Sequence, residues 1–220
     1  MVDLKREDGV YRGEVNSRNL RHGRGVYEWI EGSRYDGYWS LDKNEGIGRK
    51  IYRDGGFYEG MWAESQRMGK GRLEDAEGRV FEGNFNDGQS DSAIWPSGGS
   101  FQGRCTCSEW TYEGGWKEGK RHDFGKMSMK SGASYEGEWM GDKKNGRGCM
   151  VYVDKTTYDG DWLDNKHHGE GTCTWPNGAS YTGQWVHGKR EGTGVLHSPD
   201  MSVYSGDWLK GMKQGKGKKV

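Results

Sequence analysis

The feature that most constrains the fold is a tripeptide, aromatic-x-Gly, that recurs along the chain at a nearly constant interval. Its aromatic residues are Tyr11, Tyr35, Tyr58, Phe81, Phe101, Tyr112, Tyr135, Tyr158, Tyr181 and Tyr204. Most copies lie 23 residues apart, and one short interval of 11 residues separates Phe101 from Tyr112. In most copies a Trp follows two residues after the Gly, and a Gly-x-Gly element comes next. A period of this length is the signature of a repeat architecture.

Each repeat has the pattern of a β-hairpin. The segment Tyr-x-Gly-x-Trp alternates with a period of two, so its three named residues share one face of a strand. Alternation resumes after Gly-x-Gly, as in Cys173 and Trp175, and predicts a second strand. Polar residues such as 186–191 join the two strands, and Pro176-Asn177-Gly178 marks a turn to the next repeat. A helix is excluded because each interior Gly costs about 1 kcal/mol there.

The composition indicates how such hairpins could be held together. Gly occupies 40 of the 220 positions, only 31% of the residues are hydrophobic, and the mean hydropathy is -1.10. The chain nevertheless has 11 Trp and 12 Tyr residues. We therefore expect aromatic rings to lie over bare glycine backbone on neighbouring strands and to replace an aliphatic core. A single hairpin is only marginally stable in water, so stability must come from stacking one repeat on the next.

The repeated motifs resemble the MORN (membrane occupation and recognition nexus) repeat over about residues 11–217. The residues that carry this resemblance are Tyr-x-Gly-x-Trp, the Gly-Lys-Arg-His turn at 119–122, Gly-x-Gly and Pro-Asn-Gly. The resemblance implies an all-β fold, an elongated single antiparallel sheet of tandem β-hairpins that forms a solenoid-like groove. It also implies a scaffold or adaptor without catalytic activity, because relatives of this kind belong to radial-spoke heads, cytoskeletal collars and membrane junctions.

Departures from the pattern divide the chain. We expect an N-terminal cap over 1–10, repeats 1–3 over 11–80, two shortened repeats over 81–111, repeats 6–10 over 112–217 and a tail over 218–220. The first shortened repeat lacks Gly-x-Gly, Cys105 stands where a Trp is expected, and Asp123 replaces the first Gly of the next Gly-x-Gly. The interruption over 86–111 is interpreted either as a kink or bulge that serves for docking or as a deletion without a role.

The aromatic residues of the first strands are the candidate partner groove, which could hold a helix or an extended segment. They are Tyr58, Trp62, Tyr112, Trp116, Tyr135, Trp139, Tyr158, Trp162, Tyr181, Trp185, Tyr204 and Trp208. The alternative is purely structural, with these rings only covering glycines and joining adjacent hairpins.

Charges separate by position within the repeat, although the net charge is +0. Acidic residues such as Asp36 and Glu59 face outward on the first strands. The hairpin turns are basic and form a candidate basic rim of Lys120, Arg121, Lys143, Lys144, Lys189 and Arg190. Such a rim could bind anionic phospholipid or an acidic protein surface. The alternative is that these are solvated positions kept polar for solubility.

The predicted function is that of a non-enzymatic scaffold that organises a cytoskeletal assembly. The resemblance favours a ciliary axoneme or radial-spoke-type complex, or the cell cortex, and thus a cytoplasmic, cytoskeleton-associated protein. The expected partners are proteins, among them another MORN protein, or a second copy bound through the open sheet ends. Two alternatives are a peripheral membrane module that binds anionic phospholipid through the basic rim, and a targeting subunit of an enzyme complex.

Sequence motifs for other kinds of chemistry are missing. The chain has no P-loop, complete GxGxxG, GxSxG or HExxH motif, and Cys105-x-Cys107 has no second close pair to complete a zinc site. No catalytic residue, cofactor or metal is therefore predicted. The isoelectric point near 7.0 gives no general attraction to nucleic acid. We also expect no secretory signal and no membrane span, because no long apolar run occurs.

Overall fold

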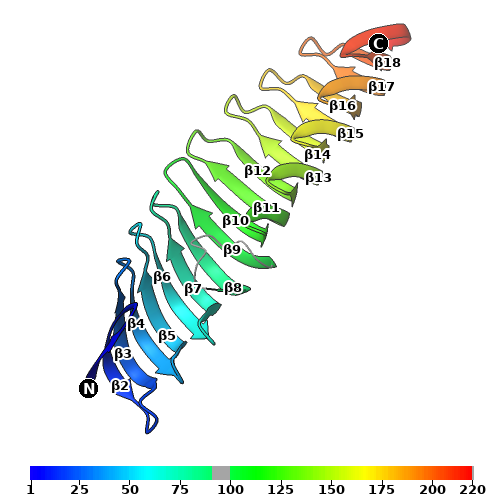
Figure 1. The fold of residues 1–220 in the computed structure, drawn as a ribbon. Helices are drawn as coiled ribbons and strands as arrows, with labels where there is room; N and C mark the ends of the chain where they lie inside the picture. The colour runs from blue at the N-terminus through cyan, green and yellow to red at the C-terminus, as the bar shows by residue number, and fades with distance from the viewer. Residues whose placement is uncertain (91–99, 220) are drawn as a thin grey trace. The chain divides into compact units, whose positions relative to one another are not determined.

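The structure, a computed structural model, describes residues 1–90 and 100–219 and is built of β-strands joined as successive hairpins (Figure 1). The described residues form 19 strands and no helix, so they contain no helix that is long and apolar enough to cross a membrane. The prediction of an all-β fold of tandem antiparallel hairpins is confirmed. The chain divides into two compact units, each of which is described by itself.

Unit 1 consists of Met1–Ser108 with Gly115–Gly119. Its strands are β1 (Val2–Arg6), β2 (Gly9–Val15), β3 (Arg21–Trp29), β4 (Arg34–Ser40), β5 (Lys43–Ile51), β6 (Phe57–Ala63), β7 (Gln66–Glu74), β8 (Val80–Ser90) and β9 (Ser100–Thr106). Each strand pairs antiparallel with the next along the chain. Residues 2–6 of the predicted N-terminal cap are therefore a strand, which lies along β2.

Unit 2 consists of Glu109–Gly114 with Lys120–Val220. Its strands are β11 (Lys120–Met129), β12 (Ser134–Met140), β13 (Lys143–Val151), β14 (Thr157–Leu163), β15 (Lys166–Thr174), β16 (Ser180–Val186), β17 (Lys189–His197), β18 (Val203–Leu209) and β19 (Met212–Lys219), and it shares β10 (Trp110–Lys117) with unit 1. From β11 onward each strand again pairs antiparallel with the next.

The register places glycine opposite glycine in almost every pair of strands. Gly137 lies opposite both Gly125 and Gly148, and Gly160 lies opposite Gly148 and Gly171. A tyrosine ring covers such a pair in most hairpins, and Phe81 stands at the tyrosine position in the hairpin of Gly83 and Gly103. Because a Cβ added to Gly148 would lie 2.3 Å from the hydroxyl of Tyr135, no larger residue fits beneath the ring. The expected packing of rings on bare backbone is therefore present.

In most repeats the hydroxyl of the first-strand tyrosine is satisfied by a carbonyl of its own strand. Tyr35 donates to the carbonyl oxygen of Tyr38 at 3.0 Å, Tyr135 to that of Glu138 at 3.0 Å, and Tyr181 to that of Gln184 at 3.1 Å. The accepting carbonyl lies at the bulge that follows the Gly pair. A buried phenol normally needs such a partner, so the bulge and the ring require each other.

The tryptophans join one repeat to the next. The indole nitrogen of Trp139 donates to the carbonyl oxygen of Gly125 at 3.2 Å, and that of Trp162 donates to Gly148 at 2.9 Å. Each acceptor is the second Gly of the preceding Gly-x-Gly. The Trp162 ring also meets Tyr135 of the preceding repeat edge-on, with centroids 5.4 Å apart. A neutral hydrogen bond and an edge-to-face ring pair each contribute about 1 kcal/mol.

Two strands lie in the region predicted as two shortened repeats, 81–111. Strand β9 pairs with β8 so that Cys105 lies opposite Phe81 and Gly103 opposite Gly83. Trp116 donates to the Gly103 carbonyl at 3.3 Å, as the other tryptophans do to their Gly-x-Gly element. The division of the chain into repeats over 81–111 stays a prediction. Residues 91–99 of the predicted kink lie outside the described residues.

The first Gly of Gly-x-Gly adopts a left-handed backbone, as shown by φ values of +64° at Gly146 and +55° at Gly169. Asp123, which the sequence analysis noted as a departure, has φ +55° at the equivalent position. Aspartate tolerates this region better than most residues do, which explains why the substitution leaves the hairpin intact.

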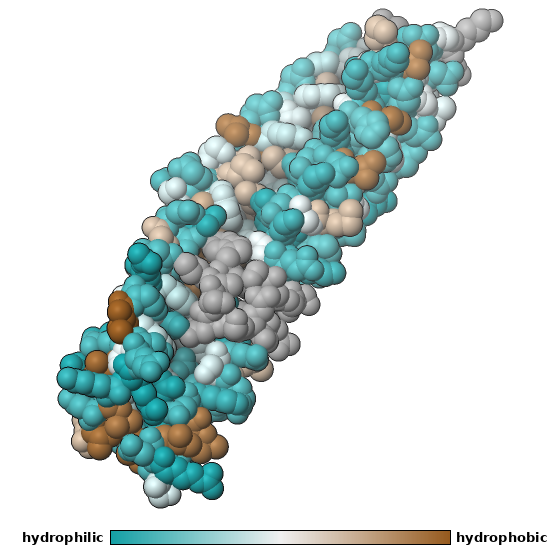
Figure 2. All heavy atoms as spheres, in the orientation of Figure 1, coloured by the Kyte–Doolittle hydropathy of each residue, from teal (hydrophilic) through white to brown (hydrophobic). Residues whose placement is uncertain are grey.

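The outer face is less acidic than the acidic residues of the first strands led us to expect. The second strands place basic residues opposite these acidic residues. Arg49 pairs with Glu59 at 3.5 Å, and Lys126 pairs with Glu136 at 3.0 Å. Figure 2 shows hydrophilic residues over much of the visible face, with separate hydrophobic ones among them. An ion pair of this exposed kind contributes only about 0–1 kcal/mol, so the outer face adds solubility more than stability.

The covered glycines give a first prediction. Gly148→Ala should destabilise the protein by about 2–3 kcal/mol, because the methyl group would overlap the rigid Tyr135 ring and the backbone cannot move away. Gly178→Ala is the matched control, since Gly178 has φ +85° but nothing within 4 Å of an added Cβ, and it should cost only about 1 kcal/mol. Urea unfolding measures both. Equal losses would contradict the role assigned to the ring.

Candidate functional site

A basic residue recurs on the aromatic face, nine or ten residues after the first Tyr of the repeat. We call this place the row position. It holds Arg21 and Arg67 in unit 1 and Arg121, Lys144, Arg190 and Lys213 in unit 2. Most of these residues lie opposite the Trp of their own hairpin, as Lys144 lies opposite Trp139, whereas Arg21 lies opposite Val15. The row position is the main feature of this face that the sequence analysis did not separate from the turns.

Four of the row cations, Arg21, Arg121, Lys144 and Arg190, lie over the Trp ring of the next repeat. The Arg21 guanidinium carbon is 4.2 Å from the Trp39 ring centroid, the Lys144 ammonium is 4.4 Å from that of Trp162, and Arg190 is 4.1 Å from that of Trp208. Cation–π contacts in partly buried places contribute about 0.5–2 kcal/mol each. Burial of its ammonium group lowers the pKa of Lys144, with a smaller effect of Arg121 in the same direction.

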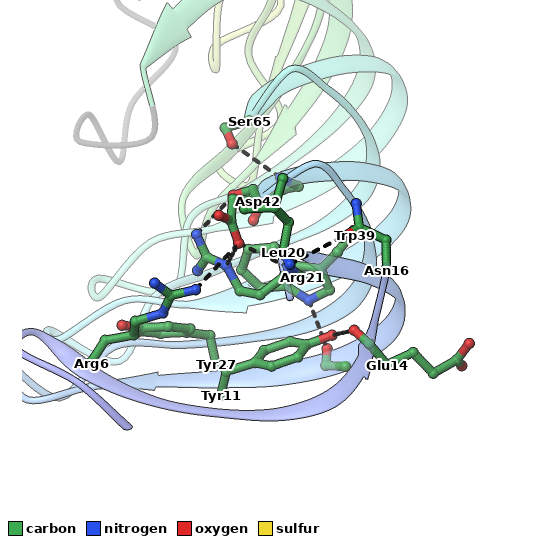
Figure 3. Close-up of polar contacts among 12 residues, drawn as sticks. Arg6, Tyr11, Glu14, Asn16, Leu20, Arg21, Tyr27, Trp39, Asp42 and Ser65 are labelled. Atoms are coloured by element: carbon green, nitrogen blue, oxygen red, sulfur yellow. Dashed lines mark hydrogen bonds and ion pairs between the residues drawn. The ribbon is translucent and has the colours of Figure 1, made fainter. Parts of the chain in front are cut away.

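An aspartate of the following turn fixes the arginine at two row positions. Arg21 donates to Asp42 from its Nε at 3.0 Å, from its backbone N at 2.9 Å, and to the Asp42 carbonyl at 2.8 Å (Figure 3). Arg121 and Asp142 repeat these contacts, with Nε to Oδ1 at 2.9 Å. Burial alone would raise the pKa of Asp42, but the hydrogen bonds from Arg21 outweigh it and lower that pKa.

A backbone hydrogen bond at the same place joins successive repeats. The amide of Asn165 donates to the carbonyl oxygen of Lys144 at 3.0 Å, and that of Gly188 donates to His167 at 2.8 Å. The row residue is thus held at its backbone and, where it is charged, over a ring. The row cations are fixed parts of the face and not freely moving side chains.

Two row positions carry a neutral residue, Asn44 in unit 1 and His167 in unit 2. His167 stacks on Tyr158 with centroids 3.6 Å apart, and its Nε2 lies 2.9 Å from the hydroxyl of Tyr152. Burial, and secondarily the charge of Lys144, lowers the pKa of His167 to about 4. The imidazole is therefore uncharged at neutral pH.

The residues of the predicted partner groove lie together on the aromatic face of their units, packed edge to face. All of them except the half-buried Tyr204 are buried, and the most exposed of the buried ones is Trp185 at 6%. A partner on this face would therefore contact mainly the groups above the rings, which include the row cations. Whether such a partner exists stays a prediction.

The residues of the predicted basic rim lie in two different places. Lys120, Lys143 and Lys189 are exposed at the starts of their strands, and Lys143 pairs with Asp164 at 2.9 Å. The other three, Arg121, Lys144 and Arg190, are half-buried row cations. The alternation of a strand explains the difference, because neighbouring residues point to opposite faces.

The cysteines and acidic groups form no metal site among the described residues, where no cluster of three or more His, Cys, Asp and Glu side chains occurs. No disulfide joins Cys105, Cys107, Cys149 and Cys173, all of which are among the described residues. Burial, which outweighs the opposing charge of Arg190, raises the pKa of the Cys173 thiol to about 11. Such a thiol is a poor nucleophile at neutral pH.

Open antiparallel hairpins with a repeated ring-on-glycine layer define a class of β-hairpin repeat proteins. The family model described as "MORN repeat" matches residues 11–34, 35–57, 58–78, 112–134, 135–157, 158–180, 181–200 and 204–220. The chain therefore belongs to the MORN repeat family, and the resemblance stated from its motifs is confirmed. A comparison with curated proteins found no match.

Several solved structures are similar to the chain. The wild-type TCP10 domain of Danio rerio CPAP is 9% identical, with a TM-score of 0.46 over 96% of this chain and 95% of that one. The same domain in complex with a peptide of Danio rerio STIL is 11% identical, with a TM-score of 0.39 over 96% and 97%. The SAS-4 TCP domain of Drosophila melanogaster, in complex with a proline-rich motif of Ana2, is 10% identical, with a TM-score of 0.31 over 92% and 97%.

The row arginines give a second prediction. Arg121→Gln should lower the free energy of unfolding by about 1–2 kcal/mol, because it removes both the contact over Trp139 and the ion pair with Asp142. Lys120→Gln changes the neighbouring exposed charge and should cost less than about 0.5 kcal/mol. Chemical denaturation of the two variants measures the difference. Equal stabilities would show that the row cation does not support the aromatic layer.

The buried imidazole gives a third prediction. Because the pKa of His167 is lowered in the folded state from 6.5 to about 4, the unfolded chain takes up its proton first as the pH falls. The stability that this neutral group provides is present above about pH 6.5 and is lost as the pH falls toward 4. Between about pH 7 and about pH 5 the loss should be about 1 kcal/mol, after allowance for partial exposure.

His167→Asn, which copies Asn44, should remove this part of the pH dependence in urea unfolding. His197→Gln, at an exposed position, is the control and should leave the profile as in the wild type. An unchanged profile in His167→Asn would contradict the burial of a neutral imidazole.

Proposed function

We propose that the chain is a non-enzymatic scaffold or adaptor that organises a cytoskeletal assembly. The first candidate is a complex of the radial-spoke type in a ciliary axoneme, and a cortical assembly is the second. On this proposal the protein is cytoplasmic and associated with the cytoskeleton. Its partners are proteins, and another MORN protein is among the candidates.

The observation that carries this proposal is the extent of the repeats. The matched segments run from residue 11 to residue 220 and are interrupted only around the irregular repeat and at 201–203. Each repeat presents the same row position and the same layer of rings, so the face offers regularly spaced contacts instead of one catalytic centre. MORN repeats are in general non-catalytic modules, and repeated surfaces of this kind suit the binding of other proteins.

A protein partner would find two kinds of contact within each unit. The row cations and the predicted partner groove beneath them lie on one face and would receive a segment with acidic or aromatic side chains. Among the described residues β1 pairs with β2 alone, so its other edge offers backbone groups to another strand. Pairing of such an edge with a second copy or with another MORN protein is the form of end-to-end association that we propose.

Membrane binding is the second candidate function. The exposed lysines Lys120, Lys143 and Lys189 support it, since each such charge near an anionic leaflet contributes about 1 kcal/mol. It ranks below the scaffold because the other three residues of the predicted basic rim lie over aromatic rings. Flotation with vesicles that contain phosphatidylserine and phosphoinositide, at physiological salt, tests it directly.

Proximity labelling with the full chain in ciliated cells tests the scaffold. We expect axonemal or other cytoskeletal proteins to be labelled well above a control in which the same labelling enzyme is expressed alone. The matched variant carries Lys120→Glu, Lys143→Glu and Lys189→Glu, which reverse exposed charges and leave the row cations in place. It should keep the protein partners, because the proposed contacts are elsewhere on the molecule.

Other outcomes separate the candidates. Two results together would favour the membrane module over the scaffold. The wild-type chain would float with the vesicles while the triple variant would not, and proximity labelling would be unselective. Strong labelling of a single enzyme without cytoskeletal proteins would favour the third prediction, a targeting subunit of an enzyme complex.

A further inference from the structure

Two places in the described chain bring together aromatic residues from the ends of two successive hairpins. In unit 1 they are Trp29 and Tyr52, and in unit 2 they are Tyr152 and Trp175. All four backbone amides close the same kind of turn, with Trp29 donating to Ser33 and Tyr152 to Thr156. The equivalent residues of the other described hairpins, Asp75, Met129 and Ser198, are not aromatic. Both aromatic pairs accompany a neutral row residue.

In unit 1 the chain itself fills the space at this pair. The ammonium group of Lys50 lies 4.4 Å from the Trp29 ring centroid and 5.6 Å from that of Tyr52, and Lys50 is only 7% exposed. A lysine on a second strand thus supplies the cation that Asn44 does not. The arrangement is an internal example of an ammonium held between aromatic faces.

In unit 2 the same register position carries Cys173. Lys50 lies opposite Tyr35 and Tyr58, and Cys173 lies opposite Tyr158 and Tyr181 in the same way. A cysteine is too short to reach the rings. A pocket of ≈ 570 Å³ is found there, and its lining includes Tyr152, Asp154, His167, Cys173, Trp175 and Trp185. This volume is within the range of about 300–1,000 Å³ that is usual for ligand sites.

The pocket lining includes one carboxylate, that of Asp154. Asp154 contributes a carboxylate whose position is fixed by hydrogen bonds from the Thr156 amide at 2.9 Å and its hydroxyl at 3.0 Å. His167 is a neutral wall, held by Tyr152 and Tyr158. The nearest row cations, Lys144 and Arg190, lie over Trp162 and Trp208, neither of which lines the pocket. Over Trp185, the row residue of the preceding strand pair is the His167 imidazole, where Trp162 and Trp208 have a cation.

We infer that this pocket binds the side chain of a lysine from a protein partner, with its ammonium group held among Tyr152, Trp175 and Trp185 and its charge balanced by Asp154. The inference names one contact of the interaction function proposed above and rests on it. A protein lysine is chosen over a choline headgroup because the chain places a lysine, Lys50, in the equivalent place.

Nuclear magnetic resonance with small probes tests the pocket. Nα-acetyl-lysine methylamide and its Nζ-trimethyl derivative should shift the indole NH signals of Trp175 and Trp185 saturably. The uncharged analogue Nα-acetyl-norleucine methylamide should bind about fivefold more weakly, the ratio that one cation–π contact of about 1 kcal/mol supplies. Equal binding of the norleucine probe would overturn the inference, and preferred binding of phosphocholine would replace the protein lysine by a lipid.

Two reciprocal variants sharpen the test. Cys173→Lys should fill the pocket from within, as Lys50 does in unit 1, and abolish the shifts caused by the lysine probes. Lys50→Cys should open the equivalent space and add a second set of shifts at Trp29. Each variant is examined by circular dichroism, and Trp175→Ala serves if Cys173→Lys does not fold. Probe binding that persists unchanged in Cys173→Lys or in Trp175→Ala would overturn the inference.

The same variants keep this inference separate from the proposed function. If Cys173→Lys retains every partner found by proximity labelling, the scaffold stands and the lysine contact is refuted. If the probes bind but no cytoskeletal protein is labelled, the pocket stands and the cytoskeletal scaffold is refuted.

Discussion

The structure depends on one contact, a tyrosine ring that lies flat on a pair of facing glycines. Because Gly137 and Gly148 carry no side chain, the Tyr135 ring can lie over their backbone and place its hydroxyl on the carbonyl of the following bulge. The indole of Trp162 then covers the ring from the next repeat and donates to Gly148. Apolar area, an edge-to-face ring pair and two satisfied donors replace the aliphatic interior that the composition lacks.

This packing decides what the exposed part of the face can be. The rings are buried by contacts with their own chain. The surface that a partner could contact therefore consists of the groups above the rings, namely the row cations and the residues at the hairpin ends. A charged row residue gains from the ring beneath it and from the following turn, as Arg21 does with Trp39 and Asp42. Where the row residue is neutral, the aromatic surface is open to a different cation, supplied by Lys50 in unit 1.

The exposed faces of the sheet have a different role. Cross-strand ion pairs such as Arg49 with Glu59 cover the outer side and keep it soluble without adding much to stability. The two faces differ because side chains alternate along each strand. Rings and row cations lie on one side, and paired charges lie on the other. The proposed function therefore expects partners on the aromatic side and at the strand edges.

The sequence alone determined the repeat period, the two strands of each hairpin and the ring-on-glycine packing. These features follow from alternation and glycine spacing, which are local patterns that recur in each repeat. Only the tertiary structure decided what depends on the register between strands. It paired β9 with β8 and so placed Cys105 opposite Phe81. It also placed Arg121, Lys144 and Arg190 over Trp rings of the next repeat. It also put Cys173 where Lys50 stands in unit 1, a correspondence that requires knowing which strands face each other.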